Sequence, residues 1–260
     1  MGLTAGVPLK ETFEMANGFD PRATAARPAD TAGLGRQGYA FDAGLRSYML
    51  RVYNLMASGV LWTGIVAFTL ALTGVAQALW SGGGILRYVV LFAPLIMVMV
   101  MGFRAHKMST GGMQAFYWAF ATVMGLSMSV IPLVYDGQSI AATFFATAAA
   151  FASLSLWGYT TKKDLSGFGT FLIMGVVGLI IAMLINIFLR SPAMDLAISA
   201  IGVLLFAGLT AYDTQKIKNT YAYVQGTDML GKSAILGALT LYLDFINMFQ
   251  FLLSFMGNRD

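Results

Sequence analysis

The chain is built from long apolar stretches separated by short charged or turn-forming segments. Flanking charges and turn residues bound seven of these stretches: 56–79, 85–103, 113–135, 140–159, 168–189, 196–213 and 234–257. A helix needs about 20 residues to cross a hydrocarbon core of about 30 Å, and each stretch is near that length. The polar–apolar alternation of membrane strands is absent, and the runs are too long for strands. The pattern therefore predicts an all-α polytopic membrane protein with seven spanning helices.

Composition supports a membrane location and narrows the chemistry. The chain is 58% hydrophobic and 11% charged, whereas soluble domains are about 45–50% apolar and about 25% charged. A soluble chain of this composition would leave large apolar patches in water. There is no cysteine and His106 is the only histidine, which excludes thiolate sites and two-histidine metal motifs. We expect the lipid bilayer as surroundings, no nucleic-acid partner and no tightly bound cofactor.

The first 45 residues differ from the rest of the chain. They contain three prolines, scattered Gly, Ala and Thr, and no sustained helical period. No apolar run begins where a cleaved signal peptide would have one. We predict a disordered cytoplasmic tail over 1–45, followed by a seven-helix transmembrane domain over 46–260 that opens with an amphipathic lead-in at 46–54.

The basic residues are distributed unequally between the two sides of the predicted bundle. If the N-terminus is cytoplasmic, 13 of the 16 Lys and Arg residues lie on that side, and Arg87, Arg190 and Arg259 lie on the other. Cytoplasmic loops carry such an excess of positive charge. We therefore predict that the N-terminus is inside and the C-terminus outside, and that the membrane is a bacterial inner (plasma) membrane.

Two acidic residues, Asp213 and Asp244, are the only acids within the apolar stretches. An aspartate at the centre of a membrane helix costs about 2.5–3.5 kcal/mol on insertion scales. Such residues normally face the bundle interior and mark a path for ions or protons. Asp213 closes the sixth stretch three residues before Lys216, so a plain interfacial ion pair is the alternative interpretation.

Asp244 lies eleven residues beyond Ser233, or about 16 Å into the last helix. It shares one helical face with small and polar residues, namely Ser233, Gly237, Thr240, Asn247 and Ser254. This stripe predicts a helix surrounded by others, with Thr240 and Asn247 supporting the lining of a pore. The alternative is a protonated aspartic acid that is hydrogen-bonded in the core.

The last two helices are consecutive and antiparallel, so both carboxyl groups fall in the cytoplasmic half of the membrane. Two carboxyl groups held close together cannot both ionise easily, and such a pair shares a proton at low pH. When the proton leaves, the pair becomes an anionic oxygen site. Asp213 and Asp244 therefore predict a pH-sensitive cation gate. Arg104, at the inner end of the second helix, is either a counter-ion for this pair or a positive-inside anchor.

The residues around both aspartates resemble the signatures of a known family. Residues 211–217 (AYDTQKI) and 241–249 (LYLDFINMF) are similar to motifs of the Bax inhibitor-1 family, the transmembrane Bax-inhibitor-motif proteins. Residues 162–166 (KKDLS) are similar to the family's loop between the fourth and fifth helices. The resemblance covers residues 45–257, and the last-helix motif is long enough to be specific.

The resemblance implies a fold in which the seventh helix is central and is wrapped by two three-helix layers. It also implies a pH-sensitive calcium leak gated by aspartates at the positions of Asp213 and Asp244, where calcium binds transiently. A basic residue at the position of Arg104 would latch to the first aspartate. The family's basic cluster is reduced here to Arg104, followed by Ala105, His106 and Lys107.

We therefore predict a calcium-permeable leak channel or transporter, not an enzyme, with calcium and protons as its partners. An intramembrane aspartyl protease is a less favoured alternative, because the usual Gly-x-Gly-Asp context is missing at both Asp213 and Asp244. A protein that binds and regulates other membrane proteins is the remaining alternative.

Overall fold

The computed structural model describes residues 28–82 and 84–258, and the side chains within them from Phe41 onward. Its contacts divide the chain into two compact units, Met1–Gly44 and Leu45–Asp260. Of the first unit, the described part is the beginning of the first helix. The architecture below is that of Leu45–Asp260.

Every element in the described residues is a helix. In chain order they are α1 (Pro28–Leu72), α2 (Val75–Ser81), α3 (Ile85–Arg104), the 3₁₀ helix η1 (Ala105–Lys107), α4 (Thr110–Met128), α5 (Ile131–Val134), α6 (Gly137–Thr160), α7 (Ser166–Leu189), α8 (Pro192–Val224) and α9 (Met229–Met256). Seven segments within the described residues are long and apolar enough to cross a membrane. The predictions of an all-α fold and seven spans are confirmed.

Local sequence signals explain where several helices begin. The Ser109 hydroxyl accepts a hydrogen bond from the Gly112 N–H at the start of α4, and the Asp136 carboxylate accepts one from the Ser139 N–H at the start of α6. Side chains of this type satisfy the free N–H groups of a first helical turn. At α8, Ser191 caps the helix and Pro192 occupies its first turn, where its missing N–H costs nothing.

Two helix boundaries differ from the sequence prediction. α1 already begins at Pro28, so residues 28–45, expected in a disordered tail, are helical, whereas residues 1–27 lie outside the described part. α8 continues to Val224 rather than ending at Asp213. Extending a formed helix adds one hydrogen bond per residue without a new nucleus, so polar residues can continue it beyond the apolar run. The apolar run therefore marks the hydrocarbon depth and not the end of the helix.

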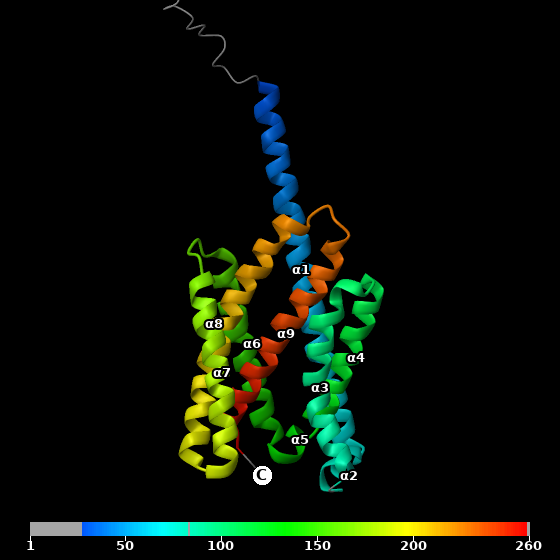
Figure 1. Ribbon diagram of the computed structural model, residues 1–260, viewed down its shortest axis with the longest axis vertical. Coiled ribbons are helices and arrows are strands. Elements are labelled where there is room, and N and C mark those ends of the chain that lie inside the picture. Colours follow the sequence, from blue (N-terminus) through cyan, green and yellow to red (C-terminus); the bar gives the residue numbers. More distant parts are fainter. Residues whose placement is uncertain (1–27, 83, 259–260) are drawn as a thin grey trace, which may run out of the picture. The chain divides into compact units, whose positions relative to one another are not determined.

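The last helix, α9, is the inner element of the bundle. Within its apolar window 61% of residues are buried, against 17–33% in the other six spans. It packs against α6 and α8 on one side and against α4 on the other, and a hydrogen bond joins it to α1. Figure 1 shows α9 (orange to red) passing between α6–α8 and the group of α1, α3 and α4. The predicted arrangement, with the seventh span central to two three-helix layers, is confirmed.

Candidate functional site: a buried aspartate pair

Asp213 and Asp244 come from the two helices that pack most extensively in the bundle, α8 and α9. Both side chains are buried, with 9% of Asp213 and 4% of Asp244 exposed. The two carboxyl groups lie close enough to act on each other electrostatically. The structure thus brings together the two acids that the sequence singled out, and it places Asp213 inside α8 rather than at its end.

The Asp244 carboxyl group has an unused bonding position. Its Oδ2 atom is buried and has no hydrogen-bond partner among the described residues. Buried polar atoms are nearly always bonded, so an orphan carboxyl oxygen requires an explanation. A proton or a cation on this oxygen would satisfy it. A direct carboxyl–carboxyl contact also requires a shared proton, because two bare carboxylates repel each other.

Lys216 does not neutralise the pair by direct contact. Its Nζ atom lies over the Tyr212 ring, 5.9 Å from the ring centroid. Asp213 turns instead toward α9, and the part of the chain that the structure describes contains no ion pair between Asp213 and Lys216. A contact ion pair is therefore not formed in the described part of the chain, although the Lys216 charge still attracts the Asp213 carboxylate from a distance.

Hydrogen bonds next to Asp213 tie α8 to two neighbouring helices. The Thr214 Oγ1 atom is 2.8 Å from Ser155 Oγ on α6, and Ser155 Oγ is 2.6 Å from the Tyr53 hydroxyl on α1. Thr214 and Ser155 are both buried. This chain of three hydroxyl groups fixes the rotation and depth of α8 at the level of Asp213.

A second set of bonds joins α8 to the loop between α6 and α7. The Gln215 amide donates to the Lys163 carbonyl oxygen at 2.8 Å and accepts from the Leu165 N–H at 2.9 Å. Lys218 Nζ donates to the Tyr159 carbonyl oxygen at 2.7 Å. Sequence reasoning did not assign roles to Thr214 or Gln215. The available signal was two polar residues that directly follow an aspartate in an apolar span.

On the other side of the pair, Tyr242 anchors α9. Its ring is fully buried, and its hydroxyl lies 2.6 Å from Thr63 Oγ1 on α1. The ring packs edge to face against Tyr117 and Phe120 of α4. These contacts hold the turn of α9 that precedes Asp244. Together with the bonds of Thr214 and Gln215 on α8, they fix both helices that carry the carboxyl groups.

Thr240 and Asn247 are half-buried, and their side chains bond to their own helix. The Thr240 hydroxyl donates to the Leu236 carbonyl oxygen at 3.1 Å, and the Asn247 amide donates to the Leu243 carbonyl oxygen at 2.8 Å. Both lie on the least buried strip of α9. Their role in lining a pore stays a prediction.

The structure does not bring Arg104 to the aspartate pair. Arg104 is exposed at the end of α3, and among the described residues it forms no ion pair with Asp213. The physical reason is the packing, because α3 lies against α2, η1 and α4, whereas α8 lies against α6, α7 and α9. The predicted latch between Arg104 and Asp213 is thus not formed in this structure.

The pair can offer only a weak cation site by itself. The described residues contain no group of three or more His, Asp or Glu side chains that could hold a metal ion. Calcium takes six to eight oxygen ligands in loose geometry, so two carboxyl groups would supply part of the shell and water the rest. Such a site suits an ion in transit better than a resident metal.

Comparison with known proteins gives consistent matches over the transmembrane region. Residues 45–260 match the family model described as "Inhibitor of apoptosis-promoting Bax1". A protein of Caulobacter vibrioides is 48% identical over 257 residues, which cover 94% of this chain and 100% of the relative. A Rickettsia prowazekii protein is 45% identical over 223 residues (84% of this chain, 92% of the relative). The inner membrane protein YbhL of Escherichia coli K12 is 44% identical over 219 residues (84% and 94%).

Proposed function

The chain belongs to the Bax inhibitor-1 family, and from that premise we propose that it is a pH-sensitive, calcium-permeable leak channel or transporter. Asp213 and Asp244 form its proton-sensing and ion-binding site. The observation that supports this most strongly is the meeting of two buried carboxyl groups inside the bundle. Ionisable groups inside a membrane bundle are typical of ion and proton paths.

The mechanism follows from the charge of the pair. With a shared proton, the carboxyl groups hold each other and present little net attraction to a cation. When the proton leaves, two anionic oxygens repel each other and attract a divalent cation. Proton and calcium therefore compete for the same oxygens, and calcium binding strengthens as the pH rises. Because the site is weak, the ion can leave again, which conduction requires.

We further propose that the protein resides in an inner (plasma) membrane, with its N-terminus cytoplasmic. The name of the Escherichia coli relative places that protein in the inner membrane, and the excess of basic residues on one side supports the orientation.

The test is calcium efflux from proteoliposomes that contain the purified protein, measured across about pH 5 to 8. We expect a pH-dependent efflux in the wild type and a flattened pH response in Asp213→Asn and in Asp244→Asn. Asp228→Asn is the matched control, because Asp228 is exposed and its side chain makes no capping hydrogen bond. Wild-type pH dependence in both pair variants would overturn the proposal.

The same samples separate the two alternatives. Cleavage of a membrane peptide that is lost in both pair variants would indicate an intramembrane protease. No calcium efflux from pure liposomes, together with a stoichiometric partner recovered from native membranes, would indicate a regulatory binding protein.

A further inference from the structure

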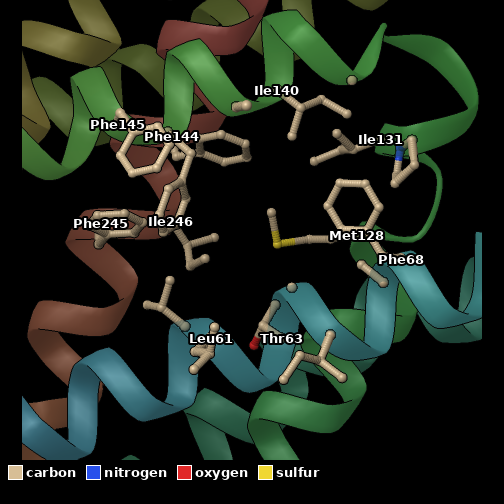
Figure 2. Close-up of a pocket in the computed structure, with 18 residues that line it drawn as sticks. Leu61, Thr63, Phe68, Met128, Ile131, Ile140, Phe144, Phe145, Phe245 and Ile246 are labelled. Atoms are coloured by element: carbon tan, nitrogen blue, oxygen red, sulfur yellow. The ribbon is translucent and has the colours of Figure 1, made fainter.

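A crevice separates α1 from α6, and it consists of two adjoining cavities. The first, of about 430 Å³, lies near the α5 end and is lined by α1, α6 and α9 residues that include Leu61, Phe145 and Ile246. Figure 2 shows Leu61 and Thr63 on α1 facing Phe144, Phe145 and Ile140 across this space, with Phe245 and Ile246 of α9 beside them. The second, of about 540 Å³, continues along α1 toward its N-terminal end. Val60, Phe144 and Phe245 line both cavities, which places them end to end.

The walls of the crevice are apolar, and its rim faces the lipid. Leu61 (63% exposed) and Phe145 (71%) stand at the rim of the first cavity, and Leu50 and Leu156 stand at the rim of the second. Thr63 contributes a hydroxyl to the first cavity, but this hydroxyl is already bonded to Tyr242 and to the Ala121 carbonyl oxygen. Both volumes are within the range of about 300–1,000 Å³ typical of ligand pockets. An apolar space that opens to hydrocarbon gains dispersion contacts when hydrocarbon fills it.

The second cavity ends in a positive charge. Arg46 lines it at the end where Tyr159 also lies, and Arg46 is exposed. Among the described residues Arg46 makes no hydrogen bond or ion pair, so its guanidinium is available to an anion. A guanidinium binds phosphate well because its N–H groups match two phosphate oxygens. From Arg46 to Val60 the crevice follows α1 for about 21 Å, at about 1.5 Å per residue. This is about two thirds of the thickness of the hydrocarbon core, and it is similar to the length of an extended acyl chain.

We propose that this crevice is a binding site for one anionic phospholipid. The lipid phosphate pairs with Arg46, and one acyl chain fills the second cavity and runs between α1 and α6 past Phe144 and Phe245. The charge at one end and the apolar walls between α1 and α6 together define this site. Neither aspartate lines the cavities, although Tyr53 and Ser155, which connect to Thr214 beside Asp213, line the second one. The proposal does not depend on calcium transport.

The test measures phospholipid that stays bound after extraction. The protein is reconstituted in vesicles of equal parts phosphatidylcholine and phosphatidylglycerol, extracted in mild detergent, and weighed by native mass spectrometry. We expect one retained phosphatidylglycerol per chain. Ala148→Leu fills the second cavity from α6 and should lower this retention by about fivefold or more. Ala150→Leu is the matched control, because Ala150 is exposed on the same helix and does not line either cavity.

A second variant tests the contact between Arg46 and the lipid headgroup. Arg46→Gln should reduce the preference for phosphatidylglycerol over phosphatidylcholine by about fivefold, whereas Arg51→Gln on another face of α1 should leave it unchanged. If Ala148→Leu does not accumulate as folded protein, Ala152→Leu fills the same cavity. Equal retention in Ala148→Leu and Ala150→Leu, no retained lipid in the wild type, or an unchanged headgroup preference in Arg46→Gln would each overturn the proposal.

Discussion

The backbones of α6 and α8 approach each other closely at Gly158, near the aspartate pair, and this gives a sharp prediction for Gly158→Ala. A methyl group at Gly158 on α6 would lie 2.2 Å from the Ala211 carbonyl oxygen of α8 and 2.9 Å from the Ala211 Cα atom. Ordinary van der Waals contact begins at about 3.4 Å. The clash is with backbone, so no side-chain rotation can relieve it. The two helices must separate by about 1 Å.

This separation has two costs. Forcing an extra methyl group into a packed interface costs about 1–3 kcal/mol. The Ser155–Thr214 hydrogen bond, 2.8 Å long and less than a turn from Gly158, would lengthen beyond bonding range, at a cost of about 1 kcal/mol. We expect Gly158→Ala to lower the free energy of unfolding by about 2–4 kcal/mol. Because α8 carries Asp213, the displaced helix should also flatten the pH response of calcium efflux.

The assay is reversible unfolding in mixed micelles by denaturing detergent, followed by circular dichroism. Gly178→Ala on α7 is the control, since a methyl group there meets no atom within 4 Å. That variant should be as stable as the wild type or slightly more stable, because alanine favours a helix over glycine. Equal stability of Gly158→Ala and Gly178→Ala would refute the close backbone approach.

Two further predictions concern the Thr63–Tyr242 hydrogen bond between α1 and α9 and the start of α6. Tyr242→Phe removes one hydrogen bond and should cost about 1 kcal/mol of unfolding free energy. Thr63→Val removes that bond and the bond to the Ala121 carbonyl oxygen, which keeps its partner within α4, and it leaves the buried Tyr242 hydroxyl without a partner, so it should cost about 2–3 kcal/mol. A double variant that costs the sum of both single variants would contradict the direct bond. The Ser139 hydroxyl and N–H hold the pKa of the Asp136 carboxyl below its ordinary value of 3.8, so this contribution to stability is present above that value and is lost as the pH falls through the lowered pKa. Asp136→Ala should therefore be less stable than the wild type at neutral pH in thermal unfolding, with a difference that narrows in acid, and a difference independent of pH would contradict the cap.

The membrane character and the aspartate pair could be predicted from the sequence because each has a direct physical cause. Seven apolar runs of spanning length exclude a soluble fold, and two consecutive spans must run antiparallel. Asp213 and Asp244 then stand out because charge is costly in hydrocarbon. Because the sixth and seventh spans are consecutive, their order in the chain was enough to expect Asp213 and Asp244 in the same half of the membrane.

The supporting contacts could not be predicted, because they depend on which helix faces meet. Hydropathy reports depth in the membrane but not rotation, so the polar residues after Asp213 could be noticed, but not that Thr214 bonds to Ser155 and Gln215 to the α6–α7 loop. For the same reason the sequence left open whether Arg104 is a counter-ion for Asp213 or a positive-inside anchor, and the exposed position of Arg104 in the structure agrees with the anchor. Equal depth does not mean contact, and α3 lies in the other layer of the bundle.

The most direct test of the central claim is a count of protons released when calcium binds. Calcium is added to purified protein in weakly buffered detergent solution with a pH indicator, and bound calcium is measured in parallel. If the two carboxyl groups exchange their shared proton for the ion, the wild type should release about one proton for each calcium bound, and neither Asp213→Asn nor Asp244→Asn should do so. Calcium binding without proton release in the wild type, or equal release from Asp244→Asn, would contradict a proton shared between Asp213 and Asp244.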